Sequence, residues 1–154
     1  MPRPDAASHE ATVLAFDFGT RRIGVAVGNC LLRVARPLTV IAGEANASRF
    51  AAIAALIETW HPDLLVVGRP VHADGTPHEM TSRADRFARQ LEGRFGLGVA
   101  RVDERYTTEE AETALAEAGV RAHERKTVRD QVAAQLILQA WFDDTKAAGP
   151  PGVA

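Results

Sequence analysis

Two kinds of hydrophobic periodicity follow one another along this chain, and their order constrains the fold more than any other feature. Three consecutive segments, residues 13–18, 22–27 and 34–41, have the apolar, β-prone composition of strands. Short connections join them, which is typical of an antiparallel meander. Pro37 lies within the third segment. Because proline cannot donate to a ladder of hydrogen bonds, it predicts an edge strand or a bulge there.

After the meander, helix-like and strand-like segments alternate. Apolar residues recur at helical spacing over residues 49–60, with Ser48 as the predicted N-cap and His61-Pro62 as the stop. Residues 64–68 form a continuous apolar run, as in a buried parallel strand. The remaining predicted elements are a helix over 79–95, a strand over 99–102, a helix over 107–118, a polar loop over 121–127 and a last helix over 129–143.

This order of elements predicts an α/β fold. A mixed five-stranded sheet would combine the three-strand antiparallel meander with parallel strands, and helices would pack on it. The layout is that of ribonuclease H-like proteins. The length of 154 residues fits one such domain. We predict a single domain over residues 12–144, with flexible tails at 1–11 and 145–154.

Composition excludes several classes of protein. Hydrophobic residues make up 46% of the chain and charged residues 25%, as in ordinary globular proteins. Cys30 is the only cysteine, which excludes an intrachain disulfide and suits a reducing cytoplasm. No apolar run approaches the ~18 residues of a membrane span, so we expect a cytoplasmic protein with no membrane partner. The net charge of −2 argues against a protein that simply coats nucleic acid, but it allows a local basic face.

Acidic residues lie at the ends of three predicted elements. Asp17 is near the carboxyl end of the first strand, where open α/β sheets bind their ligands. Asp103 and Glu104 follow the fifth strand, and adjacent residues of an extended chain point to opposite faces, so only one of them can face Asp17. Asp130 begins the last helix. Each acid alone also has a simpler explanation, as a turn residue, a solvated charge pair or a partner of the helix dipole.

Taken together, the acids indicate a site for divalent cations. The predicted layout brings the three element ends to one side of the sheet. Mg²⁺ prefers oxygen ligands and is held by a few carboxylates together with substrate phosphates. Two such ions ~3.5–4 Å apart can activate a water and stabilise a leaving oxygen. Three carboxylates without a cation would repel one another. The pattern therefore favours a hydrolase that cleaves phosphodiester bonds.

Six fragments of the sequence, in a fixed order, carry a resemblance to a known family. They are AFDFGTRRIGVAV at 15–27, ARPL at 35–38, PD leading to VVGRP at 62–70, DGT at 74–76, VDERYTTEEA at 102–111, and the segment from Lys126 through Asp130 to AAQLILQ at 133–139. In these fragments the chain resembles the YqgF/RuvX family, the pre-16S rRNA nucleases that are also described as Holliday junction resolvase-like proteins.

The resemblance implies a ribonuclease H-like fold and a nuclease that uses Mg²⁺ or Mn²⁺ to mature the 5′ end of 16S rRNA. Carried over position by position, Asp17, Glu104 and Asp130 match the family's acidic residues, which implies that they are both catalytic and metal-binding. Two positions depart from the family pattern. Arg69 stands where the family often has leucine, and Gly28-Asn29 stands where it often has Ser-Asp.

Five basic residues are the predicted contacts to nucleic acid. The arginines lie in or beside the loops that carry the acids, and a guanidinium can grip a phosphate with two parallel hydrogen bonds. The lysine lies in the basic segment before the last helix. Ordinary solvated ion pairs remain the alternative for each of them. The five residues are Arg21, Arg22, Arg69, Arg105 and Lys126.

Other functions remain open from the sequence alone. A structure-selective nuclease for branched DNA would use the same acids, but two cuts would require a homodimer, so monomer and homodimer are both considered. A ribosome-assembly factor could keep the fold and bind RNA, as precursor rRNA or a ribosomal particle, without cleaving it. The D-x-G-T turn at 17–20 also opens sugar-kinase and actin-type ATPases, but these need two domains around a cleft.

Overall fold

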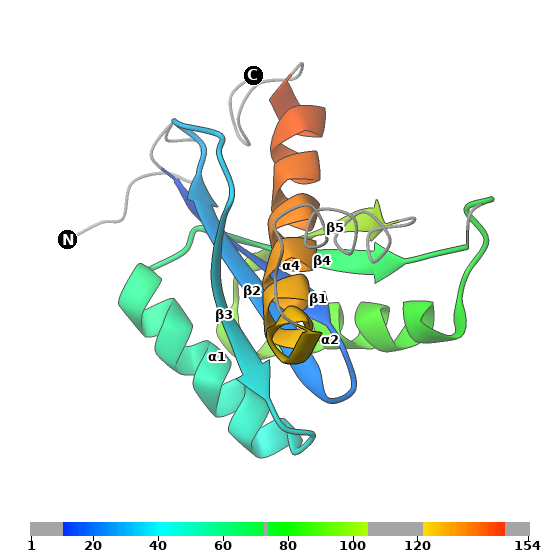
Figure 1. The fold of residues 1–154 in the computed structure, drawn as a ribbon. Coiled ribbons are helices and arrows are strands. Elements are labelled where there is room, and N and C mark those ends of the chain that lie inside the picture. Colours follow the sequence, from blue (N-terminus) through cyan, green and yellow to red (C-terminus); the bar gives the residue numbers. More distant parts are fainter. Residues whose placement is uncertain (1–10, 73, 105–121, 147–154) are drawn as a thin grey trace.

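A single mixed sheet organises the chain, and Figure 1 shows its layers in a computed structural model that describes residues 11–72, 74–104 and 122–146. The strand order is β3-β2-β1-β4-β5. β1 (Thr12–Phe18), β2 (Arg22–Asn29) and β3 (Arg36–Ala42) form an antiparallel meander. β4 (Leu64–Pro70) runs parallel to β1, and β5 (Gly98–Glu104) runs parallel to β4. The predicted α/β class and mixed five-stranded sheet are confirmed.

Both expectations for Pro37 are confirmed. β3 is an edge strand of the sheet. Its pairing with β2 shifts register, because Thr39 lies opposite Val25 whereas Pro37 lies opposite Ala26. Leu38 is therefore the extra residue of a bulge. The missing N–H of proline is tolerated at such a position because no neighbouring strand needs it.

Helices cover both faces of the sheet. α1 (Asn46–Trp60) and α2 (Glu79–Phe95) pack on one face, and α4 (Ala122–Lys146) crosses the other. Side chains of β1 alternate between the two layers. Leu14 and Phe16 join the buried cluster under α1 and α2, whereas their neighbours Val13 and Ala15 join the cluster under α4. We call these two sides the α1–α2 face and the α4 face.

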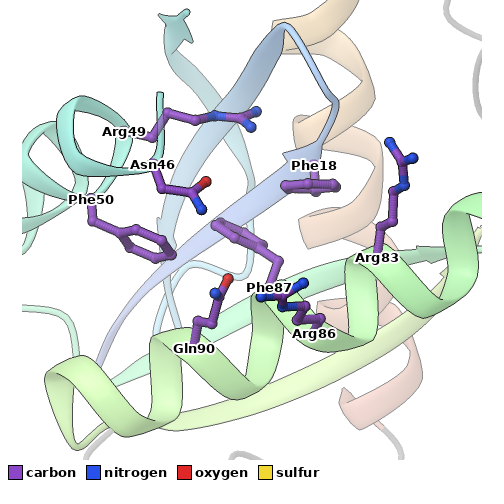
Figure 2. A pocket seen from close by; sticks show the side chains of 8 residues that line it. All are labelled: Phe18, Asn46, Arg49, Phe50, Arg83, Arg86, Phe87 and Gln90. Carbon is purple, nitrogen blue, oxygen red and sulfur yellow. The ribbon is translucent and has the colours of Figure 1, made fainter. Parts of the chain in front are cut away.

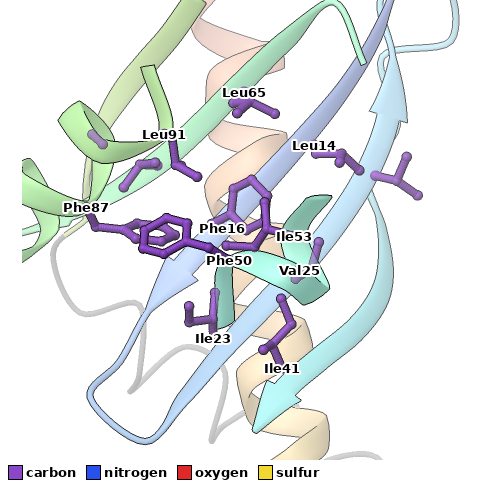
Figure 3. Close-up of a cluster of buried hydrophobic side chains, with 13 residues drawn as sticks. Leu14, Phe16, Ile23, Val25, Ile41, Phe50, Ile53, Leu65, Phe87 and Leu91 are labelled. Atoms are coloured by element: carbon purple, nitrogen blue, oxygen red, sulfur yellow. The ribbon is translucent and has the colours of Figure 1, made fainter. Parts of the chain in front are cut away.

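Aromatic packing anchors the α1–α2 face, as Figure 3 shows. The ring of Phe87 lies 6.0 Å from that of Phe16 in an edge-to-face arrangement, and it lies 4.9 Å from Phe18 and 6.0 Å from Phe50. Phe87 belongs to the predicted inward face of the helix over 79–95, and α2 has those bounds. The helical periodicity was sufficient to predict the bounds of α2, because one face of this helix is apolar and the other is charged.

Three local predictions are wrong. Ala45, not Ser48, is the N-cap of α1, and the Ser48 hydroxyl donates to the Ala45 carbonyl at 3.0 Å. The last helix begins at Ala122 and includes 122–127, which was predicted as loop. This segment contains residues with good helix propensity, although it lacks an apolar stripe. β5 extends to Glu104 because β4 continues to Pro70 and pairs with it.

Some predictions lie wholly or partly outside the described residues. They include the helix predicted over 107–118 and most of both predicted tails. Where the tails are described, Ala11 is buried and accepts a hydrogen bond from the Cys30 amide, and α4 continues to Lys146. Among the helices that the structure describes, none is both long and apolar enough to cross a membrane.

Candidate active site

Three acids approach one another on the α4 face, at the end of the sheet where β1 and β5 finish. β1 contributes Asp17, β5 contributes Glu104 and α4 contributes Asp130. Two glycines leave the space that this requires. A Cβ on Gly68 of β4 would lie 3.0 Å from Glu104 Oε1, and a Cβ on Gly24 of β2 would overlap the Asp130 carbonyl oxygen. The close approach of α4 to the sheet therefore depends on residues without side chains.

The electrostatics of Asp17 show how closely the three carboxyls interact. Burial raises the pKa of the Asp17 carboxyl well above its ordinary value, and the negative charges of Glu104 and Asp130 raise it further. A side-chain hydrogen bond with Glu104 also favours the protonated form of Asp17. The end of β1 is thus a place where negative charge is unfavourable unless a cation compensates it.

Asp130 is engaged by a cation of the chain itself. Arg22 Nε, at the start of β2, donates to Asp130 Oδ2 at 2.7 Å. Within the ranges that the structure describes, no three His, Cys, Asp or Glu side chains lie close enough together to hold one metal ion as they stand. The arrangement combines a hydrogen-bonded carboxyl pair, Asp17 with Glu104, and an ion pair, Arg22 with Asp130.

The position of Asp130 also removes the simpler explanation for it. The sequence prediction placed Asp130 in the first helical turn, where a carboxylate complements the helix dipole. α4 begins at Ala122, so Asp130 lies about two turns inside the helix. The helix dipole therefore does not explain why an acid stands at this position. The Asp130 side chain is 20% exposed and is joined to the sheet by its ion pair with Arg22 of β2.

Asp103 and Glu104 divide between the two faces of β5, as their alternation predicts. Glu104 is partly buried and interacts with Asp17. The Asp103 side chain is 50% exposed, and its Oδ1 accepts from Arg69 Nη1 at 3.4 Å. Only one of the two acids therefore belongs to the cluster on the α4 face.

The predicted nucleic-acid contacts lie in different surroundings. Arg22 is bound to Asp130, and Arg69 Nε donates to both carboxylate oxygens of Asp85, at 3.0 and 3.2 Å. Arg21 is exposed in the turn between β1 and β2. Arg105 lies outside the described residues, and Lys126 lies in α4 at a position whose side chain is not described. A role in substrate binding stays a prediction for all five.

Sequence reasoning missed one arginine beside this site. Arg49 of α1 is only 4% exposed, and its Nη2 donates to the carbonyl oxygen of Gly19, in the turn after Asp17. Arg49 thus supports the turn that carries Asp17 from the opposite face of the sheet. Its place next to Phe50 and one turn before Ile53 was the available signal, because these residues form the buried stripe of α1.

The raised pKa of Asp17 has a consequence for stability. In the folded protein Asp17 keeps its proton at a pH where the unfolded chain has released it, so metal-free stability should fall as pH rises above about 3.8 through the folded pKa. Asp17→Asn cannot ionise. It should flatten this dependence and raise the melting temperature at neutral pH. Thermal denaturation in EDTA between pH 4 and 8 measures both effects, with Asp103→Asn as the exposed control. Equal pH slopes for wild type and Asp17→Asn would contradict the assignment.

Comparison with known proteins identifies the family. The model of the RuvX family, described as a Holliday junction resolvase, matches residues 11–144. A protein of Nitrosomonas europaea is 56% identical over 148 residues, which cover 96% of this chain and 99% of that protein. One of Methylobacillus flagellatus is 54% identical over 143 residues, covering 93% of this chain and 97% of that protein. Both bear the name "Putative pre-16S rRNA nuclease".

Solved structures share the fold at low sequence identity. T. thermophilus RuvC in complex with a Holliday junction substrate is 14% identical, with a TM-score of 0.53 over 92% of this chain and 99% of that chain. The Fowlpox virus resolvase, in complex with its substrate Holliday junction DNA, is 7% identical, with a TM-score of 0.54 over 86% and 97%. The fold is therefore ribonuclease H-like. With the family matched along residues 11–144, the chain belongs to the RuvX family and is a nuclease, a hydrolase of phosphodiester bonds.

Proposed function

We propose that this nuclease depends on Mg²⁺ or Mn²⁺ and processes the 5′ end of pre-16S rRNA, with Asp17, Glu104 and Asp130 as its catalytic carboxylates. The observation that carries the proposal is the interaction of these three acids, which come from β1, β5 and α4: burial raises the pKa of Asp17, and the charges of Glu104 and Asp130 raise it further. The names of the relatives in Nitrosomonas and Methylobacillus support precursor rRNA as the substrate.

The chemistry of the donor set fits a hard divalent cation. All three groups offer oxygen ligands, which Mg²⁺ and Mn²⁺ prefer. A bound cation would offset the burial and the negative charges of Glu104 and Asp130 that raise the pKa of Asp17. An ion held by all three acids would replace the Arg22 guanidinium on Asp130, and Arg22 could then donate to a phosphate of the substrate.

The residues of the chain supply position and charge for the reaction. A bound ion would activate the attacking water and stabilise the leaving oxygen. Asp17 and Glu104 lie at the same end of the sheet, on the two strands that flank β4, and a sheet holds side chains more rigidly than a loop does. Arg49 fixes the turn after Asp17 through the Gly19 carbonyl. Gly24 lets the α4 backbone at Asp130 lie close to β2, and Gly68 leaves space for the Glu104 carboxyl.

The deciding experiment is cleavage of a 5′-extended 16S precursor RNA with Mg²⁺ or Mn²⁺, comparing wild type with Asp17→Asn. We expect metal-dependent cutting that is lost in EDTA and in the variant. Asp103→Asn, which removes an exposed carboxylate from the opposite face of the same strand, should still cut. If the RNA is bound equally by wild type and Asp17→Asn but is not cut, even within ribosomal particles, a non-catalytic role in ribosome assembly is the better interpretation.

Cleavage of branched DNA is the second candidate function. The family description and the two junction-bound structures with the same fold favour it. A four-way DNA junction should therefore be incubated beside the RNA. Cutting of the junction alone, by a protein that light scattering shows to be a dimer, would replace the rRNA proposal, because resolving a junction requires two coordinated cuts.

A further inference from the structure

A second concave site lies on the α1–α2 face, on the other side of the sheet from the acids. It is a pocket of about 290 Å³ between the start of α1 and the exposed side of α2, as Figure 2 shows. Phe18, the neighbour of Asp17 in β1, forms part of its wall. The other lining residues are Asn46, Arg49, Phe50, Arg83, Arg86, Phe87 and Gln90.

The pocket is strongly cationic. Three arginines line it, and no acidic side chain does. Arg83 and Arg86 are exposed, and they take part in none of the ion pairs found in the described part of the chain. The one acid whose charge acts on Arg49 is Glu44, which lies before α1 and outside the lining. Three guanidinium ions with no acidic side chain in the lining favour an anionic ligand.

Arg49 contributes a buried donor that lacks an acceptor. Its Nη2 bonds the Gly19 carbonyl and its guanidinium lies 5.1 Å from the centre of the Phe18 ring, but its Nε, fully buried, has no hydrogen-bond partner. Leaving a buried polar group unsatisfied costs about 1–3 kcal/mol, and more for a charged group. Arg49 lines the pocket, and a ligand that brings an acceptor to its guanidinium would supply the partner that the described residues lack.

The start of α1 adds to the attraction for an anion. Ala45, the N-cap, offers no side-chain acceptor, and the first turn contains no acidic residue. The first backbone N–H groups of α1, which begins at the pocket residue Asn46, therefore have no side-chain acceptor from the cap. The helix dipole places partial positive charge at the same end. This 15-residue helix and the arginines act on the same space.

Part of the pocket wall is aromatic. Phe18 is partly exposed there, whereas Phe50 and Phe87 line the pocket from the buried core behind it. A bare inorganic anion would leave this surface unused. A nucleotide carries a phosphate together with a sugar and a base, and bases stack favourably on aromatic and arginine side chains.

We propose that this pocket is a binding site for the phosphate of a nucleotide, held by Arg49, Arg83 and Arg86 at the start of α1, with the sugar or base against Phe18. The site goes beyond the proposed catalytic function because it uses no carboxylate and lies on the opposite face of the sheet. Its connection to the acids is direct. Arg49 holds Gly19, and Phe18 is bonded to Asp17.

The first test follows the Nε–H signal of Arg49 in ¹⁵N-correlated NMR spectra, recorded in EDTA so that no metal-dependent step contributes. We expect 5′-AMP to shift this signal and adenosine, which lacks the phosphate, to leave it in place. If millimolar 5′-AMP does not change the chemical shift of this signal, the proposal is contradicted. This readout is independent of cleavage, so the proposed nuclease function can fail while the phosphate site stands, or the reverse.

The second test measures fluorescence anisotropy of a labelled single-stranded oligonucleotide without terminal phosphates, again in EDTA. Arg83→Gln with Arg86→Gln should weaken binding about tenfold at low salt and lower the salt slope by about 1.4, since each phosphate contact on a single strand contributes ~0.7. The control is Arg36→Gln with Arg89→Gln, which removes the same charge from exposed positions outside the pocket. Equal binding by both double variants would overturn a strand-binding role.

The two probes also identify the source of the phosphate. If the oligonucleotide moves the Arg49 signal and its affinity depends on Arg83 and Arg86, the pocket holds the backbone of a nucleic-acid strand. If only 5′-AMP moves the signal, the pocket holds a free mononucleotide. Either result supports the phosphate site. Loss of both responses in folded wild-type protein would remove it.

Discussion

Replacing Glu104 by glutamine should lower the rate of metal-dependent cleavage by on the order of 100-fold or more, because a metal site contributes several kcal/mol to charge stabilisation and each ~1.4 kcal/mol is tenfold in rate. The neighbouring change Asp103→Asn should alter the rate by less than about fivefold, since an exposed ion pair is worth at most ~1 kcal/mol. The difference arises from strand pleating, which places Glu104 beside Asp17 and Asp103 toward solvent.

Single-turnover cleavage of the precursor RNA at saturating Mg²⁺ or Mn²⁺ measures this difference. Circular dichroism should show that both variants are folded. The pair forms a matched test, because both changes neutralise one carboxylate in the same strand. A larger loss in Asp103→Asn than in Glu104→Gln would mean that the carboxyl pair on the α4 face is not the catalytic centre.

Gly24→Ala should cause the largest loss of stability among small substitutions in the sheet. Its Cβ would overlap the carbonyl oxygen of Asp130, so α4 would have to move away from β2. Overpacking of this kind costs about 1–3 kcal/mol and occasionally more. Because Gly24 pairs with Asp17 in the ladder, the same displacement should move Asp130 away from Asp17 and reduce cleavage.

The matched control is Gly93→Ala, on an open part of α2 where a Cβ would meet nothing within 4 Å. Alanine is a better helix former than glycine, so this change should stabilise the protein by about 0.5–1 kcal/mol. Urea denaturation of both variants, with cleavage assayed in parallel, separates the two effects. A Gly24→Ala protein as stable as wild type would show that α4 does not rest on β2 as closely as the structure indicates.

Periodicity predicted those elements whose own sequence contains the signal. α2 has the predicted bounds. One of its faces is apolar and the other charged along the whole helix, and His78 and Gly96 cap its N- and C-terminus. The edge position and the bulge of β3 followed from the chemistry of one proline. Such features are local, so an isolated sequence is enough to predict them.

Predictions failed where a neighbouring element decides the outcome. β5 reaches Glu104 because β4 offers pairing partners as far as Pro70, which the residues of β5 alone do not reveal. The early start of α4 was missed because its first turns lack an apolar stripe. For the same reason the first-turn position predicted for Asp130 was wrong, although its approach to Asp17 was correctly expected.

The sequence predicted the proximity of the three acids but not the partners of the basic side chains, and the functional roles of both stay predictions. The carboxylates could be found because strand ends and side-chain alternation limit where they point. The pairing of Arg22 with Asp130 joins residues 108 positions apart, and the burial of Arg49 depends on how α1 lies over β1. The partners of long flexible side chains depend on how the folded backbone brings distant segments together, so sequence spacing does not predict these partners.

The alternation at the end of β1 also bears on how a protein of this kind can diversify. One peptide bond separates Asp17, on the α4 face, from Phe18, on the α1–α2 face. With the proposed phosphate site, substitutions at exposed positions of α2 such as Arg83 and Arg86 would change what is bound without touching the carboxyls, whereas a change at Arg49 would reach both sides through Gly19. Selection could then alter ligand preference through α2 separately from reaction chemistry, although adjacent residues of one strand serve both.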